Sequence, residues 1–166
     1  AYEHCLEVPG ILQATVIDLP EAVLVERPFL HTSLAAALKH GQLVEEERHW
    51  IGLQLISAVA QLHGLGQFHG DLRPANLLLT SYGRIFLADL APFKPYRMPK
   101  DDSCLFEYFY NEGGAEKSYL APERLVHCEV QEGCEWAQGN LQEWQQADLY
   151  GLGLVLAELH VEEALY

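Results

Sequence analysis

The stretch His69-Gly70-Asp71-Leu72-Arg73-Pro74-Ala75-Asn76 decides the fold of this chain, together with Asp89 beyond the next two apolar runs. It places a carboxylate, Asp71, close to the cation Arg73 and the amide Asn76. Asp89 adds a second carboxylate one predicted hairpin further on. Phosphoryl transfer needs a positioned hydroxyl, neutralised phosphate charge and a bound divalent cation. The stretch therefore predicts a phosphoryl-transfer or nucleotide–magnesium site.

Each of the four side chains has a distinct expected role. Asp71 can accept or orient a hydroxyl proton, and Arg73 can face a phosphate. Asn76 and Asp89 offer the oxygen ligands that magnesium prefers. The alternatives are ordinary: a lone loop aspartate is most often a turn or cap residue. His69 is expected to be a packed, hydrogen-bonded core histidine.

The composition predicts one globular domain. The chain has 166 residues, of which 49% are hydrophobic and 10% aromatic, enough for a real core. The net charge of −14 argues against nonspecific nucleic-acid binding and against docking of this segment to anionic lipid. No apolar run approaches the roughly 20 residues of a membrane span.

The four cysteines show no CxxC pairing, so we expect reduced thiols of a cytosolic protein. Cys128 and Cys134 lie near His127 and Glu129, which makes a metal site conceivable. A surface insertion with incidental cysteines is the favoured interpretation, because zinc sites prefer shorter ligand spacings.

Periodicity and turn residues predict the elements. Two short strands are expected within 10–30, at Ile11–Ile17 and Ala22–Val25. A short helix, Leu34–His40, capped by Thr32 or Ser33, is expected to follow. A long helix is expected at Val44–His63, with an apolar stripe of Ile51, Leu55, Val59 and Leu62. Further strands are expected near Phe68, at Leu77–Leu79 and at Ile85–Ala88, and an aromatic, mobile or docking segment at Phe106–Tyr110. A helix apolar on nearly every side, Gln145–His160, is expected to be buried, with Asp148 as its N-cap unless it has another role.

The order of the motifs is specific. A long helix precedes His69-x-Asp71-x-Arg73-x-x-Asn76, two strands and Asp89-Leu90-Ala91, and then come Ala121-Pro122-Glu123 and Asp148-x-Tyr150-Gly151 within a helix. This order resembles that of eukaryotic protein kinases. The resemblance implies an α+β, protein-kinase-like fold, consisting mainly of the helical large lobe with the hinge and the last small-lobe strands. It implies a partial domain, a fragment of a longer chain. Residues 1–25 are then the end of the small lobe, 26–31 the hinge, and 32–166 the large lobe up to the central buried helix, with an insertion at 126–145.

Finer matches include Phe68-His69-Gly70-Asp71, Phe93-Lys94-Pro95 and Tyr119-Leu120-Ala121-Pro122-Glu123-Arg124. They resemble the vacuolar-sorting, kinase-like regulatory subunits of class III phosphatidylinositol 3-kinase complexes. That resemblance implies partnership with the lipid kinase catalytic subunit and coiled-coil autophagy or trafficking subunits. It also implies a cytoplasmic location on endosome, Golgi or autophagosome membranes, reached through parts outside this chain.

The resemblance also implies roles by position. Asp71 is the catalytic-loop aspartate, Arg73 contacts the transferred phosphate, and Asn76 and Asp89 hold Mg²⁺. The nucleotide, ATP or GTP, contacts Leu78 and the backbone of the hinge residues Glu26, Arg27 and Pro28. Three residues are expected to be structural: His69, Glu123 and Asp148.

Several positions depart from the usual kinase pattern. Gly70 stands where an arginine usually grips a phosphorylated loop, Ala91 replaces a glycine, and Arg73 replaces a lysine. The first lysine is Lys39, after the predicted hinge, so the phosphate-pairing strand lysine and Gly-rich loop are not found here. Three hypotheses remain open: a protein kinase, a nucleotide-binding pseudokinase scaffold, or an interaction module without nucleotide.

Overall fold

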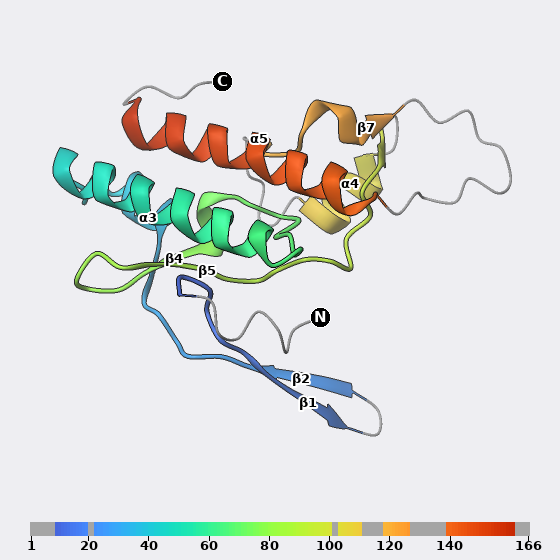
Figure 1. Cartoon of the computed structure of the whole chain (residues 1–166), viewed down its shortest axis with the longest axis horizontal. Coiled ribbons are helices and arrows are strands. Elements are labelled where there is room, and N and C mark those ends of the chain that lie inside the picture. The colour runs from blue at the N-terminus through green and yellow to red at the C-terminus, as the bar shows by residue number, and fades with distance from the viewer. Residues whose placement is uncertain (1–8, 20–21, 101–102, 111–117, 127–138, 162–166) are drawn as a thin grey trace, which may run out of the picture. The chain divides into compact units, whose positions relative to one another are not determined.

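A computed structural model describes residues 9–19, 22–100, 103–110, 118–126 and 139–161 (Figure 1). The chain divides into two compact units. The first unit comprises Ala1–Gln67 and Pro74–Asp89, and the second comprises Phe68–Arg73 and Leu90–Tyr166. The stretch that decides the fold therefore crosses from one unit to the other after Arg73, and each unit is described by itself.

The first unit contains two small antiparallel sheets. Strands β1 (Thr15–Leu19) and β2 (Ala22–Glu26) form a hairpin in which Thr15 pairs with Glu26. Strands β3 (Thr32–Ser33), β4 (Leu77–Leu79) and β5 (Ile85–Leu87) form the other sheet, in that order. The first strand was expected from residue 11 onward. Instead Ile11 makes an isolated bridge to Leu87, because Leu87 N–H donates to the Gly10 carbonyl at 2.7 Å.

Two helices complete the first unit. Helix α2 (Leu34–Lys39) is capped by Ser33, whose hydroxyl accepts from Ala36 N–H at 3.3 Å, as predicted. Helix α3 (Glu45–Gly64) begins with three glutamates, and the carboxylate of Glu47 accepts from Val44 N–H at 3.1 Å. The predicted stripe of α3 is confirmed as buried core; its members are Ile51, Leu55, Val59 and Leu62. A short 3₁₀ turn, η1 (Pro74–Asn76), leads into β4.

The second unit is mainly helical. It contains helix α4 (Ser103–Tyr110), the short turn η2 (Pro122–Arg124) and helix α5 (Leu141–His160). Strand β6 (Met98–Pro99), before α4, pairs in parallel with β7 (Leu125–Val126), after η2. One core cluster contains Tyr96, Ala121, Trp144 and Ala147, with Phe68 packed against it. A second contains Met98, Tyr110 and Leu120. No described helix is long and apolar enough to cross a bilayer.

Four expectations for the second unit are wrong. The segment around Phe68 is not a strand, because its backbone polar groups go to Asp148 and Ala91. Helix α5 begins at Leu141 and not at Gln145, because Asn140 and Glu143 exchange side-chain bonds to each other's N–H groups at 2.9 and 2.8 Å.

The N-cap of α5 is consequently Asn140, and Asp148 lies two turns inside the helix. Only one face of α5 is buried, since Leu149 is 54% exposed. The proposed insertion at 126–145 overlaps β7 and the start of α5. Its remaining part, including Cys128 and Cys134, lies outside the described residues.

Candidate active site

The predicted catalytic loop, residues 68–73, lies in the second unit and is anchored by Asp148. This carboxylate, buried in the middle of α5, accepts from His69 N–H at 2.7 Å and from Gly70 N–H at 2.9 Å. His69 itself is fully buried, as expected, and its Nδ1 accepts from Asp71 N–H at 3.3 Å. Hydrogen bonds from two N–H groups to a charged acceptor fix the loop from beneath.

Gly70 allows the segment after Asp89 to approach this loop closely. Its φ is +82°, and a Cβ at this position would lie 2.9 Å from the Ala91 carbonyl oxygen. Ala91 N–H in turn donates to the His69 carbonyl at 2.8 Å. The glycine that stands where kinases usually carry arginine is thus required by the geometry of its own unit.

Asp71 is held between two cations. The Lys94 ammonium lies 2.8 Å from its Oδ2, and Nε of Arg73 lies 3.3 Å from the same oxygen. All three side chains are less than a tenth exposed. Arg73, which was expected to face a phosphate, therefore pairs with Asp71, and the second cation is Lys94, for which no role was predicted.

Arg73 points into the second unit. Its Nη1 donates to the Tyr110 carbonyl at 3.2 Å. Tyr110 is buried at the end of α4, its ring lies 4.7 Å from the Lys94 ammonium, and its hydroxyl donates to the Pro95 carbonyl at 3.1 Å. Burial raises the pKa of Tyr110, with Arg124 opposing and Asp71 reinforcing the shift, so the hydroxyl remains a donor at neutral pH.

Arg124 organises the surroundings of this cluster. Its guanidinium donates to the carbonyls of Tyr96 and Pro95 at 2.8 and 2.9 Å, contacts the Tyr110 hydroxyl, and lies 3.5 Å from the Gly70 carbonyl. It also lies 4.6 Å from the centroid of the Trp144 ring. One buried side chain therefore connects the predicted catalytic loop to the segment after Asp89 and to α4 and α5.

The first unit holds the two predicted magnesium ligands. Asn76 is buried at the end of η1, and its carbonyl accepts from Ala88 N–H at 2.9 Å. The residue after Ala88 is Asp89, with a φ of +60°, and no other described non-glycine residue has a positive φ. Such a conformation costs about 1–3 kcal/mol and is concentrated at functional sites.

The side chain of Arg27 forms an ion pair with Asp89. Nη2 of Arg27 is 3.2 Å from Asp89 Oδ2, and the two side chains are 36% and 51% exposed. An ion pair this exposed contributes about 0–1 kcal/mol. A divalent ion can therefore displace Arg27 at little cost, and the carboxylate and amide oxygens of Asp89 and Asn76 fit magnesium.

The predicted nucleotide residues have contrasting environments. Glu26 ends β2, Arg27 and Pro28 follow it, and all three are exposed. Leu78 is buried in β4. Glu123 is exposed in η2.

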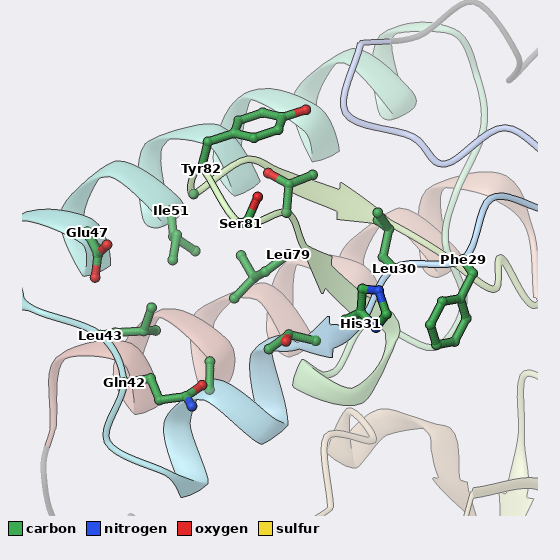
Figure 2. A pocket seen from close by; sticks show the side chains of 14 residues that line it. Phe29, Leu30, His31, Gln42, Leu43, Glu47, Ile51, Leu79, Ser81 and Tyr82 are labelled. Atoms are coloured by element: carbon green, nitrogen blue, oxygen red, sulfur yellow. The ribbon is translucent and has the colours of Figure 1, made fainter.

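A cavity of about 500 Å³ lies elsewhere in the first unit (Figure 2). It is bounded by 29–32, by α2 and the start of α3, and by the β4–β5 turn. Figure 2 shows Leu43, Ile51, Leu79 and Tyr82 among its lining side chains. Leu79 lines it and Leu78 does not. Because neighbouring residues of a strand point to opposite faces, this cavity is separate from the predicted purine contact.

The structure thus brings Asp71 and Arg73 together in the second unit. In the first unit, Asn76 accepts a backbone hydrogen bond from Ala88, the residue before Asp89. The convergence of Asp71, Asn76 and Asp89 on one ion stays a prediction. Sequence reasoning missed the roles of Lys94, Tyr110 and Arg124. Lys94 stands in the Phe93-Lys94-Pro95 motif, but no spacing rule pairs it with a carboxylate 23 positions earlier.

Comparison with known proteins gives a consistent result. A family described as "Protein kinase domain" matches residues 11–166. The chain is 38% identical to "Serine/threonine-protein kinase VPS15" of Arabidopsis thaliana over 122 residues, 70% of the chain. It is 31% identical to "Serine/threonine-protein kinase vps15" of Schizosaccharomyces pombe over 90% of the chain, and 30% identical to "Serine/threonine-protein kinase VPS15" of Saccharomyces cerevisiae over 94%. It spans only 8%, 8% and 11% of the lengths of these relatives, respectively.

Proposed function

Because this chain belongs to the protein kinase domain family, we propose that it is a serine/threonine kinase-like regulatory subunit of a class III phosphatidylinositol 3-kinase complex that binds a purine nucleotide with magnesium. Its partners are the lipid kinase catalytic subunit and coiled-coil subunits. Its setting is endosomal trafficking and autophagy, on endosome, Golgi or autophagosome membranes. The names of the VPS15 relatives support the serine/threonine kinase-like part of this proposal.

The environment of Asp89 is the observation that best supports the nucleotide–magnesium proposal. Its carboxylate is half exposed, its backbone is left-handed at the end of β5, and its partner is a cation that a metal ion can displace. When bound, magnesium neutralises phosphate charge. The chain's own residues hold the loop: Asp148 fixes His69 and Gly70.

Thermal unfolding of the full-length protein in its complex tests this proposal. A nucleotide present at 100 times its Kd stabilises by about 2.7 kcal/mol, so Mg–ATP or Mg–GTP is expected to raise the Tm. Asp89→Asn removes a charged ligand and is expected to abolish the shift. Glu107→Gln, which neutralises an exposed carboxylate on α4, is the matched control and keeps the shift. Absence of any shift in the unmodified protein contradicts the proposal.

A second candidate, a scaffold without phosphate transfer, is favoured by Gly70. The close approach of Ala91 fills the place of an arginine side chain, so ordering of the loop through a phosphate–arginine contact at this position is excluded. Phosphate transfer by the complex, measured with Asp71→Ala alongside, separates the two candidates. Equal phosphate transfer by the unmodified protein and by Asp71→Ala would rule out the kinase candidate.

A further inference from the structure

We infer that Lys94 is an internal competitor for Asp71: its ammonium occupies the carboxylate that a substrate hydroxyl must reach, so that nucleotide binds without efficient transfer. This inference rests on the proposed nucleotide-binding function and specifies its regulation. The contact is direct, with 2.8 Å between Lys94 Nζ and Asp71 Oδ2.

The competing contact is sheltered from solvent. The Lys94 and Asp71 side chains are 7% and 8% exposed, and the ammonium also faces the Tyr110 ring at 4.7 Å from its centroid. A hydroxyl must come within about 2.6–3.2 Å of the base that takes its proton. In that step the hydroxyl oxygen bonds to the γ-phosphorus, the bond to the bridging oxygen breaks, and the nucleoside diphosphate leaves. Lys94 holds the position from which the proton would pass to Asp71.

The backbone on both sides of Lys94 fixes it there. Lys94 N–H donates to the Ala91 carbonyl at 3.2 Å, and Ala91 N–H donates to His69 at 2.8 Å. On the other side, the Pro95 carbonyl accepts from Arg124 Nη2 at 2.9 Å and from the Tyr110 hydroxyl at 3.1 Å. The contact is therefore held by the segment as a whole and not by one flexible side chain.

Gly70 is what makes the arrangement possible. Because a Cβ at Gly70 would meet the Ala91 carbonyl at 2.9 Å, a larger residue would displace the turn that delivers Lys94. The glycine in place of the usual arginine and the contact of Lys94 with Asp71 therefore depend on each other. Arg73 Nε lies 3.3 Å from Asp71 Oδ2 and still balances the charge of Asp71 when Lys94 is replaced. The Lys94→Met variant is therefore expected to fold.

The first test compares phosphate transfer from Mg–ATP to a generic basic protein substrate by full-length complexes. Lys94→Met is expected to increase the rate at least about tenfold, since general-base catalysis contributes about 10²–10⁴-fold. Adding Asp71→Asn to Lys94→Met is expected to remove the increase. Lys100→Met is the matched control, since this lysine is exposed six residues further along the same segment, and is expected to transfer at the unmodified rate.

Transfer by Lys94→Met at or below the unmodified rate, with its nucleotide-dependent Tm shift retained, overturns the inference. A second measurement does not depend on the variant folding. Pulse acylation of the unmodified complex by an amine-reactive ester, read by mass spectrometry, is expected to modify Lys94 much more slowly than Lys100. Equal rates overturn the inference. Loss of the nucleotide shift in the unmodified protein refutes the proposed function instead, while the acylation contrast still decides whether Lys94 is engaged.

Discussion

Asp148 is the residue on which the geometry of the catalytic loop depends most directly. It accepts two buried backbone N–H groups, those of His69 and Gly70. Each buried donor left without a partner costs about 1–3 kcal/mol. Asp148→Ala is therefore expected to lower the free energy of unfolding by about 3 kcal/mol, measured by denaturant titration. Gln146→Ala, on an exposed site of the same helix, is the control, and a similar loss in both variants contradicts the assignment.

Tyr110 is expected to make the stability of the folded protein depend on pH in the alkaline range. Burial is the main cause that raises its pKa above the ordinary value of 10.0. A raised pKa in the folded state means that the unfolded chain loses its proton first. The stabilisation is complete below pH 10.0 and is lost as pH rises through the folded-state pKa.

Tyr110→Phe tests this linkage. The variant loses the hydroxyl contacts to Pro95 and Arg124, so about 1 kcal/mol of stability is expected to be lost at neutral pH. It is also expected to show a shallower loss of stability above pH 10.0, where Tyr96, whose pKa burial also raises, still contributes. Tyr108→Phe is the control, because this side chain is 79% exposed. Identical pH profiles for Tyr110→Phe and the unmodified protein contradict the linkage.

At the scale of elements, α5 supports the loop through close backbone contact. A Cβ at Gly151 would lie 2.8 Å from the Leu72 carbonyl oxygen, whereas a Cβ at Gly153 would meet nothing within 4 Å. Overpacking against fixed backbone costs about 1–3 kcal/mol, so Gly151→Ala is expected to destabilise by that amount. Gly153→Ala is expected to stabilise by about 0.5–1 kcal/mol through helix propensity. Equal effects of Gly151→Ala and Gly153→Ala on the Tm would show that the close approach of α5 to the Leu72 carbonyl does not require Gly151.

Local signals predicted the first unit well. The Ser33 cap, the stripe of α3 and the strand β4 follow from patterns within a few residues. The errors came where distant partners decide. The backbone near Phe68 bonds to Asp148 and not to a neighbouring strand. No helix was predicted at Phe106–Tyr110, where Phe106, Phe109 and Tyr110 pack on Met98 and Leu120. Periodicity cannot reveal partners 79 positions away.

At the scale of the whole molecule, the order of motifs along the chain predicted the family, because that order can be read directly from the sequence. It could not predict that Lys94 and Arg27 lie at the two predicted carboxylates, Asp71 and Asp89. Lys94 lies in the Phe93-Lys94-Pro95 match and Arg27 in the predicted hinge, but no local pattern pairs either residue with a carboxylate. Ion pairs between residues far apart in the sequence are therefore the part of the site that could not be predicted from the sequence.

The charge balance of the chain predicts how its stability responds to salt. It has 24 acidic and 10 basic residues, a net charge of −14. An excess of one sign destabilises the compact state by self-repulsion, and the Debye length falls to about 10 Å at 0.1 M salt. The Tm in the absence of nucleotide is therefore expected to rise with NaCl. KCl at equal ionic strength is the control for a specific sodium effect and is expected to give the same rise. A fall in Tm with salt would mean that ion pairs such as Arg27–Asp89 outweigh the repulsion between the excess acidic side chains.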